Sequence, residues 1–195
     1  MPRSIVQLVV KIGGGLLAHA AHLDAALACV AAAAVDRRLL VVPGGGPFTE
    51  AVRNVDRQIG LSEDTAHWMA VLGMDQNAHL LASRLPRAMI VDDRAGIVSA
   101  VAATAGASRR IPVLAPYRWL HQADPLRHTW DITSDSISAW IAGQLGAERL
   151  VLIKPPMASG PALVDVQFTR VLPAHVTPVI VPADQIDTLK SALAG

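Results

Sequence analysis

Residues 128–154, HTWDITSDSISAWIAGQLGAERLVLIK, hold the side chains with the clearest chemical potential in the sequence. Thr133, Ser134 and Asp135 stand just before an apolar pattern that is typical of a helix. Such residues favour helix N-termini, because their side-chain oxygens accept hydrogen bonds from the free N–H groups there. One hydroxyl is therefore expected to cap the helix, which places Asp135 in the first turn. There its carboxylate can fix a lysine ammonium group, and the strand that follows ends on Lys154.

Two runs of three glycines follow apolar segments. Gly13–Gly15 come after Lys11 and the run IVQLVV, and Gly44–Gly46 come after RLLVVP. Glycine lets backbone N–H groups approach an anion closely, and a helix that follows adds its positive N-terminal end. Either run alone is equally well explained as a tight turn. Two runs in equivalent places, one beside a lysine, indicate a phosphate site.

The elements that must position these residues can be read from apolar periodicity. We expect strands at residues 5–10, 38–43, 87–93, 110–116, 149–154 and 177–182, and helices at Leu16–Val35, Thr49–Ile59, Glu63–Leu85 and Ala183–Leu193. Strands that are apolar throughout and alternate with helices predict an α/β fold, a three-layer αβα sandwich with a mainly parallel central sheet. Ligands bind such sheets beyond the carboxyl ends of the strands, where both glycine runs fall. The stretch KPPMASGP (154–161) predicts a loop.

Composition excludes several classes of protein. Among 195 residues, 17 Lys and Arg offset 16 Asp and Glu, so the net charge of +1 gives no nucleic-acid or membrane footprint. The lone cysteine, Cys29, allows no disulfide within one chain, which favours the cytoplasm. The N-terminal apolar run is too short for a signal peptide or a membrane span. The length predicts one domain, residues 1–195.

Four segments together resemble the amino acid kinase family, which includes acetylglutamate, carbamate, aspartate and uridylate kinases. They are VVKIGGGLL, VVPGGGPFTEAVR, DTAHWMAVLGMDQNAHLLASRL and TWDITSDSISAWIAGQLGAERLVLIK, which fall in the family's order over residues 5–154. Within the family, the sequence is most similar to the small branch that contains the aminomethyl-furanmethanol phosphate kinase of methanofuran and methylofuran biosynthesis. The resemblance implies an ATP-dependent kinase that uses Mg²⁺, acts on a small phosphate or carboxylate acceptor, and forms a homo-oligomer.

The resemblance also implies roles for individual residues. Catalysis is implied for Lys11, Asp135 and Lys154. Contact with the acceptor is implied for Gly44, Gly45, Gly46, Arg53, Thr133 and Ser134. Contact with the nucleotide phosphates is implied for Lys11, Gly13, Gly14 and Lys154. No side chain is expected to bind a metal directly.

The sequence departs from the family after Lys154. Relatives continue with Thr-Asp or Thr-x-Asp-Gly, whereas this chain reads PPMASGPALVDVQF. The expected division is an acceptor-binding part at 1–147 and a shortened nucleotide-binding part at 148–195. Lys154 either replaces the family's second catalytic lysine or only neutralises a phosphate. Two alternatives to a self-sufficient kinase stay open: a binding module without turnover, and a subunit whose partner completes the ATP site.

Other polar residues are explained in simpler ways. Arg53 suits a phosphate-bearing acceptor, with an exposed ion pair as the alternative. His67, on the long predicted helix, is expected in a helix interface or the core rather than in a metal site. The aromatic and basic segment 116–128 is expected to be a loop that covers the acceptor pocket. The aspartates at 92–93 are expected to cap a turn rather than bind magnesium.

Overall fold

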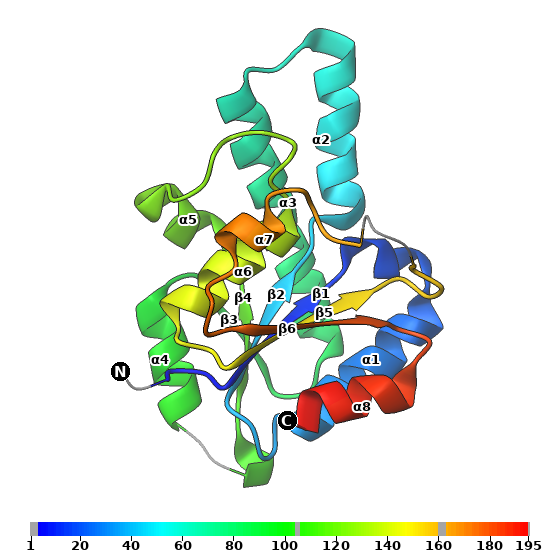
Figure 1. The fold of residues 1–195 in the computed structure, drawn as a ribbon, viewed down its shortest axis with the longest axis vertical. Helices are drawn as coiled ribbons and strands as arrows, with labels where there is room; N and C mark the ends of the chain where they lie inside the picture. Colours follow the sequence, from blue (N-terminus) through cyan, green and yellow to red (C-terminus); the bar gives the residue numbers. More distant parts are fainter. Residues whose placement is uncertain (1–3, 104–105, 160–162, 195) are drawn as a thin grey trace.

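The computed structural model describes residues 4–103, 106–159 and 163–194, and a six-stranded sheet lies at its centre (Figure 1). The strands are β1 (Leu8–Ile12), β2 (Leu39–Pro43), β3 (Ala88–Val91), β4 (Ile111–Leu114), β5 (Arg149–Lys154) and β6 (Thr177–Pro182). The α-helices are α1 (Ala20–Ala33), α2 (Gly46–Ile59), α3 (Glu63–Arg84), α4 (Arg94–Ala103), α5 (Tyr117–Ala123), α6 (Ser134–Gln144), α7 (Phe168–Val171) and α8 (Ile186–Ala194). Two short 3-10 helices are η1 (Gly14–Ala18) and η2 (Gly106–Ser108).

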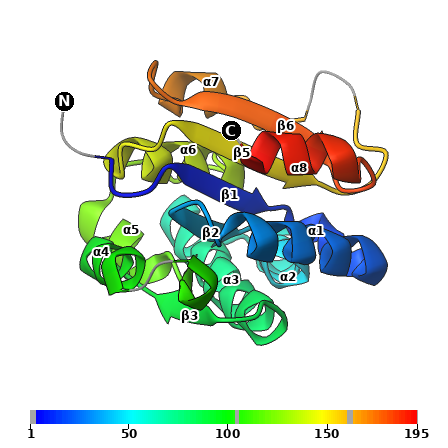
Figure 2. The ribbon, with the colours of Figure 1, turned by 90° about the horizontal axis from the view of Figure 1, so that it is seen from below.

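All neighbouring strands of the sheet are parallel, in the order β3-β4-β2-β1-β5-β6. Every residue of β1 and β2 is buried, which agrees with their continuous apolar runs. Helices cover both faces of the sheet: α1 and α8 lie on one side, and α4, α5 and α6 lie on the other (Figure 2). The predicted three-layer α/β fold is confirmed.

Alternation along the strands decides which way the two lysines point. Val9 of β1 and Leu152 of β5 pack into the core beneath α6, whereas Val10 and Ile153 pack into the core beneath α1 and α8. Side chains two residues apart on a strand share a face. Lys11 therefore shares the α6 face with Val9, as Lys154 does with Leu152.

The order of the strands also locates the crevice in which a ligand can bind. From β1 the chain continues to β2 on one side, and it later returns to place β5 on the other side of β1. The strand order therefore changes direction at β1. Open parallel sheets bind ligands beyond the carboxyl ends of the strands at such a switch point. Beyond this end, α2 and the first part of α3 form a projecting arm (Figure 1).

Several predicted elements differ from the structure. The helix predicted from Leu16 is split, because η1 ends at Ala18 and the N–H of His19 donates to the carbonyl of Leu16 before α1 begins. The expected loop 116–128 contains a helix, α5, which ends at Ala123 and is capped by Asp124 in the left-handed conformation. Helices α4 and α7 were not predicted. Residues 160–161 of the expected KPPMASGP loop lie outside the described residues. None of the helices is long and apolar enough, over the described ranges, to cross a membrane.

Candidate functional site

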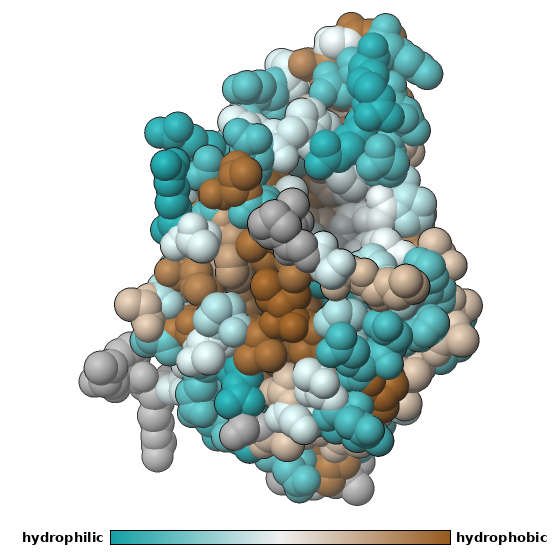
Figure 3. Space-filling model, turned by 45° about the vertical axis from the view of Figure 1, so that its right-hand side comes forward, coloured by the Kyte–Doolittle hydropathy of each residue, from teal (hydrophilic) through white to brown (hydrophobic). Residues whose placement is uncertain are grey.

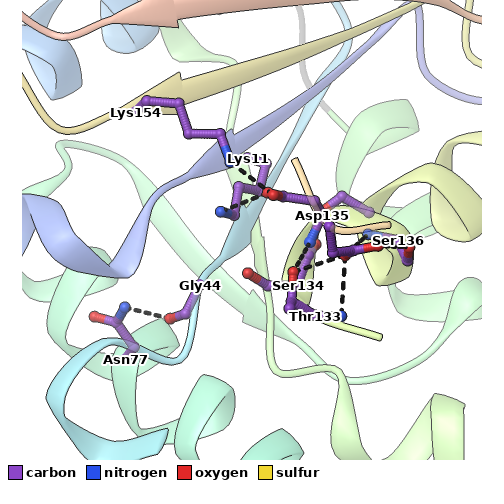
Figure 4. A network of polar contacts seen from close by, with 10 residues as sticks. Lys11, Gly44, Asn77, Thr133, Ser134, Asp135, Ser136 and Lys154 are labelled. Atoms are coloured by element: carbon purple, nitrogen blue, oxygen red, sulfur yellow. Dashed lines mark hydrogen bonds and ion pairs between the residues drawn. The ribbon is translucent and has the colours of Figure 1, made fainter. Parts of the chain in front are cut away.

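Lys11, Asp135 and Lys154 meet at the carboxyl end of β1 and β5. The Nζ atom of Lys11 lies 2.8 Å from Oδ1 of Asp135, and Nζ of Lys154 lies 2.6 Å from Oδ2. Figure 4 shows both ammonium groups directed at this one carboxylate. All three residues are at most 8% exposed. Strand alternation places the lysines on the α6 face, and the first turn of α6 brings the carboxylate to them.

Burial and charge act against each other in this triad. Burial by itself would raise the pKa of Asp135, but the charges of Lys11 and Lys154 outweigh it and hold that pKa below its ordinary value. Burial lowers the pKa of Lys154, and the neighbouring charge of Lys11 lowers it further, against the opposing effects of Asp135 and Asp165. Two buried ammonium groups that share one carboxylate leave an excess positive charge. Such a site suits an anion.

The positions of the few lysines in the sequence also indicate that the triad is the candidate functional site. The sequence has only three lysines among its 17 basic residues, and two of them are Lys11 and Lys154. The third, Lys190, lies on the surface with 63% of its side chain exposed. A lysine ammonium is a compact point charge on a flexible stem, in contrast to the planar fork of arginine. Both buried lysines therefore converge on one buried carboxylate.

The first turn of α6 is held by a residue that the sequence analysis missed. Of the two hydroxyl residues that could cap the helix, Thr133 is the N-cap residue, and its Oγ1 accepts from the N–H of Asp135 at 3.3 Å. The stronger bonds go to Asp165, whose Oδ2 accepts from the N–H of Thr133 at 3.0 Å and from its hydroxyl at 2.7 Å. Asp165 lies 32 residues further along the chain. No local pattern could have revealed this contact.

The two glycine loops pack directly against each other. A Cβ atom on Gly14 would lie 2.1 Å from the N atom of Gly46, and one on Gly44 would lie 2.6 Å from the N atom of Gly14. Any larger residue at these positions would push one backbone away from the other. The glycines are therefore required by backbone contact, whether or not a phosphate binds there.

The glycines do not all face the site in the way the resemblance implied. The N–H of Gly13 donates to Ile153 O at 2.8 Å and that of Gly44 donates to Ile12 O at 2.8 Å, so neither N–H is offered to a phosphate. Gly14 and Gly46 begin helices, whose first N–H groups have no partner within the helix.

The carbonyl of Gly44 is also engaged. It accepts from Nδ2 of the buried Asn77 at 2.5 Å (Figure 4). Asn77 on α3 thus anchors the second glycine loop, and the sequence analysis did not identify it. An asparagine in an otherwise apolar helix face was the available signal, because a buried amide requires a hydrogen-bond partner.

A cavity of about 700 Å³ opens beside the glycine loops, between the arm and the segment that leads into α6. Figure 3 shows the surface hollowed below the projecting arm. Of the predicted site residues, the cavity lining includes Gly14, Gly45, Gly46, Arg53, Thr133 and Ser134. Gly13, Gly44 and the three triad residues do not line it. The triad is adjacent to the cavity, because Ser134 lines the cavity and Asp135 is the next residue in the chain.

Arg53 is held over an aromatic ring at the cavity wall. Its guanidinium carbon lies 4.1 Å from the centre of the Trp130 ring, and the indole Nε1 donates to Asp56 at 2.8 Å. Glu50 lies 3.8 Å from the Nε atom of Arg53. Arg53 therefore combines an ion pair with a cation–π contact, and it presents a positive edge to the cavity. The cavity lining also carries three carboxylates: Glu50, Asp56 and Glu63.

His67 contacts the cavity from α3, and its ring stacks on His128 with centroids 4.2 Å apart. Burial lowers the pKa of His67 to about 4, and the charge of His128 adds to this effect. His128 is held by Asp64 and by Asp124, and these carboxylates raise its pKa against the effect of burial. No cluster of three potential metal ligands exists among the residues that the structure describes.

The order of motifs over the first three quarters of the chain matches a known family. A sequence model described as the amino acid kinase family matches residues 7–154, more than half of the 195 residues. The chain belongs to the amino acid kinase family. The family predicted from the glycine runs and the TSDS segment is thereby confirmed. The matched range contains Lys11, Asp135 and Lys154, and ends on the last of them.

The chain is similar in sequence to one named kinase and in fold to two solved kinase structures. A [5-(aminomethyl)furan-3-yl]methyl phosphate kinase of Methanocaldococcus jannaschii is 29% identical over 149 residues, which cover 74% of this chain and 63% of that protein. This chain thus spans less than two thirds of that relative. A crystal structure of uridylate kinase from Archaeoglobus fulgidus superimposes with a TM-score of 0.69 at 14% identity, covering 97% of this chain and 98% of the other. For UMP kinase from Ureaplasma parvum the TM-score is 0.63 at 12% identity, with 95% of each chain covered.

Proposed function

We propose that this chain is an ATP-dependent phosphotransferase that acts on a small phosphorylated acceptor. The observation that carries the proposal is the meeting of Lys11, Lys154 and Asp135 at the switch point of the sheet, with contacts of 2.8 and 2.6 Å. Phosphoryl transfer requires little covalent chemistry from the protein. It depends on positioning and on stabilising the negative charge that spreads over the transferred group.

The roles in this reaction follow from the positions of the residues. An oxygen of the acceptor phosphate attacks the γ-phosphorus of ATP, the bond from that phosphorus to the β–γ bridging oxygen breaks, and ADP leaves with the electron pair. Lys11, near the end of β1 just before the first glycine loop, would lie against the transferred group. Lys154 would neutralise the nucleotide phosphates from the β5 side. Asp135 would hold both ammonium groups in place and would not itself react.

The site suits phosphates better than it suits a bare metal ion. Two buried ammonium groups and the helix starts at Gly14 and Gly46 supply positive charge and N–H donors. Side chains that could chelate a metal do not gather in threes within the described part of the chain. Mg²⁺ would therefore be held by the nucleotide phosphates, where it would supply neutralisation of their charge.

For the acceptor, we propose a compact molecule with a phosphate and an amine, and [5-(aminomethyl)furan-3-yl]methyl phosphate is the first to test. The name of the relative in M. jannaschii supports this choice. The cavity of about 700 Å³ offers a guanidinium at Arg53 for an anion and carboxylates at Glu50, Asp56 and Glu63 for a cation. Its remaining lining is largely apolar, which suits a flat ring.

The test measures ADP release from ATP in the presence of Mg²⁺, with this furan phosphate, UMP and acetylglutamate each assayed separately as the acceptor. We expect turnover with the furan phosphate. We expect Asp135→Asn and Lys11→Ala to lower kcat by on the order of 10²–10³-fold, the scale at which one preorganised charge contributes to catalysis. The surface variant Asp24→Asn should be unaffected. Binding of the acceptor by calorimetry without any ADP release would contradict a kinase and favour a binding module of the same fold.

A further inference from the structure

Asp165 lies between β5 and α7, yet its hydrogen bonds go to the start of α6. Its Oδ2 accepts from the N–H and the hydroxyl of Thr133, and from the N–H of Ser136 at 3.1 Å. Its Oδ1 accepts from the Ser136 hydroxyl and from the N–H of Gln167 at 3.1 Å. Five donors on one carboxylate are an unusually full set, because each oxygen has only two lone pairs in its plane.

The carboxylate of Asp165 accepts hydrogen bonds from the start of α6, as the side chain of an N-cap residue normally does. The first N–H groups of a helix need acceptors, and the partial positive charge there favours an anion. Thr133 already occupies the N-cap position, but its hydroxyl donates its proton to Asp165. The charged part of the cap is therefore supplied from the chain that follows Lys154.

The two residues that Asp165 grips lie on either side of Asp135. Thr133 and Ser136 are fixed through both backbone and hydroxyl groups, so the backbone between them has little freedom. Asp135 projects from this clamped turn, with its carboxylate 2.6 Å from Lys154 and 2.8 Å from Lys11. A shift of the turn by 1 Å could lengthen these contacts to about 3.6 and 3.8 Å, beyond hydrogen-bond distance.

We propose that Asp165 is a positioning residue for phosphoryl transfer, which clamps the first turn of α6 so that Asp135 holds Lys11 and Lys154 in register. The inference rests on the proposed function. Asp165 touches neither substrate in this arrangement and acts through Asp135. It also links the two parts of the site, because it follows β5 in the chain and holds the helix that precedes β5.

The charge of Asp165 acts on Lys154 as well. Burial and Lys11 lower the pKa of Lys154, whereas Asp135 and then Asp165 raise it. Removing the charge of Asp165 leaves Lys11 and Asp135 as the remaining charged groups facing Lys154. The pKa of Lys154 should therefore fall further. If the reaction needs this ammonium protonated, the alkaline limb of the kcat profile should move to lower pH.

Two variants separate positioning from a general loss of stability. Asp165→Ala removes all five acceptor bonds, and we expect kcat to fall on the order of 10²-fold, the effect of a misplacement of about 1 Å. KM should change little. Asp165→Asn retains an oxygen that can replace Oδ2 and accept from Thr133 and from the N–H of Ser136, so it should fold and still shift the alkaline limb.

Asp93→Ala is the matched control. Asp93 caps α4 by accepting from the N–H of Gly96 at 2.7 Å, beyond β3 at the edge of the sheet opposite β6. Its loss should lower the melting temperature while leaving kcat unchanged. An Asp165→Ala protein that loses stability with no greater loss of kcat than Asp93→Ala would overturn the proposal.

The titration of Lys154 provides a readout that does not depend on turnover. With lysine labelled at ¹³Cε, the chain gives only three signals, from Lys11, Lys154 and Lys190. Lys190→Arg and Lys154→Arg assign them. We expect Asp165→Asn to lower the pKa of Lys154, and an unchanged titration would refute the inference. If the wild-type protein transfers no phosphoryl group, the proposed function fails, and this titration alone decides whether Asp165 controls Lys154.

Discussion

Replacing Asp135 by asparagine should expose the electrostatic balance of the triad. Asparagine has nearly the same shape, but it removes the carboxylate charge that both ammonium groups contact, and these groups are at most 8% exposed. Breaking a buried ion pair by removing one partner costs about 3–5 kcal/mol. For a chain of this size each kcal/mol lowers the melting temperature by about 2–4 °C, so the expected drop is roughly 6–20 °C.

The dependence of this loss on pH follows from the lysines. Burial and Lys11 already lower the pKa of Lys154, and the variant removes Asp135, which opposes them, so the unfolded state binds a proton at Lys154 more readily than the folded state. The unfolding free energy of the variant should therefore rise as the pH is raised toward 10.5, the ordinary pKa of lysine. In the wild type the pKa of Asp135 is depressed, so its contribution is present above the ordinary value of 3.8 and is lost as the pH falls below it.

Urea unfolding at several pH values measures both effects. Asp24→Asn is the control, because the Asp24–Arg84 pair is short, at 2.6 Å, but its side chains are 55% and 42% exposed. Such a surface pair contributes about 0–1 kcal/mol. Adding Lys154→Met to Asp135→Asn removes one orphaned charge, and the two changes should couple by about 0.5–3 kcal/mol. A loss for Asp135→Asn no larger than that of the control, or one independent of pH, would refute this reasoning.

Three further predictions concern the surroundings of the triad. Gly14→Ala should destabilise the fold by about 3 kcal/mol or more in urea unfolding, because its Cβ would lie 2.1 Å from the backbone of Gly46. Asn77→Asp should cost about 1–3 kcal/mol in the same assay, because a carboxylate cannot donate to the carbonyl of Gly44. His67 should titrate near pH 4 by NMR, since burial and a charged neighbour lower its pKa. Its depressed pKa makes the protein lose stability as the pH falls from 6.5 toward 4.

Each of these has a contrasting outcome. Gly96→Ala should be tolerated, since its Cβ would meet side-chain atoms no closer than 3.3 Å, and equal losses at Gly14 and Gly96 would contradict the contact between the glycine loops. Asn77→Asp without measurable destabilisation would mean that Gly44 finds another donor. A His67 ring that titrates near 6.5 would show that the stacked histidine cluster is open to solvent.

Much of the site follows from local sequence patterns. A hydroxyl N-cap at Thr133 or Ser134, with Asp135 in the first turn, was predictable, because capping depends only on neighbouring residues. Lys11 and Lys154 at strand ends were predictable from apolar runs that stop at a charge. The predicted parallel α/β sandwich is also confirmed, since continuous apolar strands that alternate with helices fit few other folds.

Other features depend on contacts between distant segments. Strand β5 lies beside β1, and this brings Lys11 and Lys154 to one carboxylate. The order of the strands in the sheet cannot be inferred from any single segment of the sequence. The bonds from Thr133 to Asp165 span 32 residues, and the predicted N–H donors at Gly13 and Gly44 are already paired with the backbone of neighbouring segments.

By itself, the sequence determined which groups have chemical potential, the class of fold and the family, because these follow from residue type and local periodicity. Only the tertiary structure decided which groups meet. It placed the two lysines on the side of the sheet that α6 covers and packed the two glycine loops against each other. It also brought Asp165 to the N-terminus of α6, where its carboxylate accepts the hydrogen bonds. Those outcomes depend on long-range packing, in which each contact is fixed by the position of a strand or helix far away in the chain.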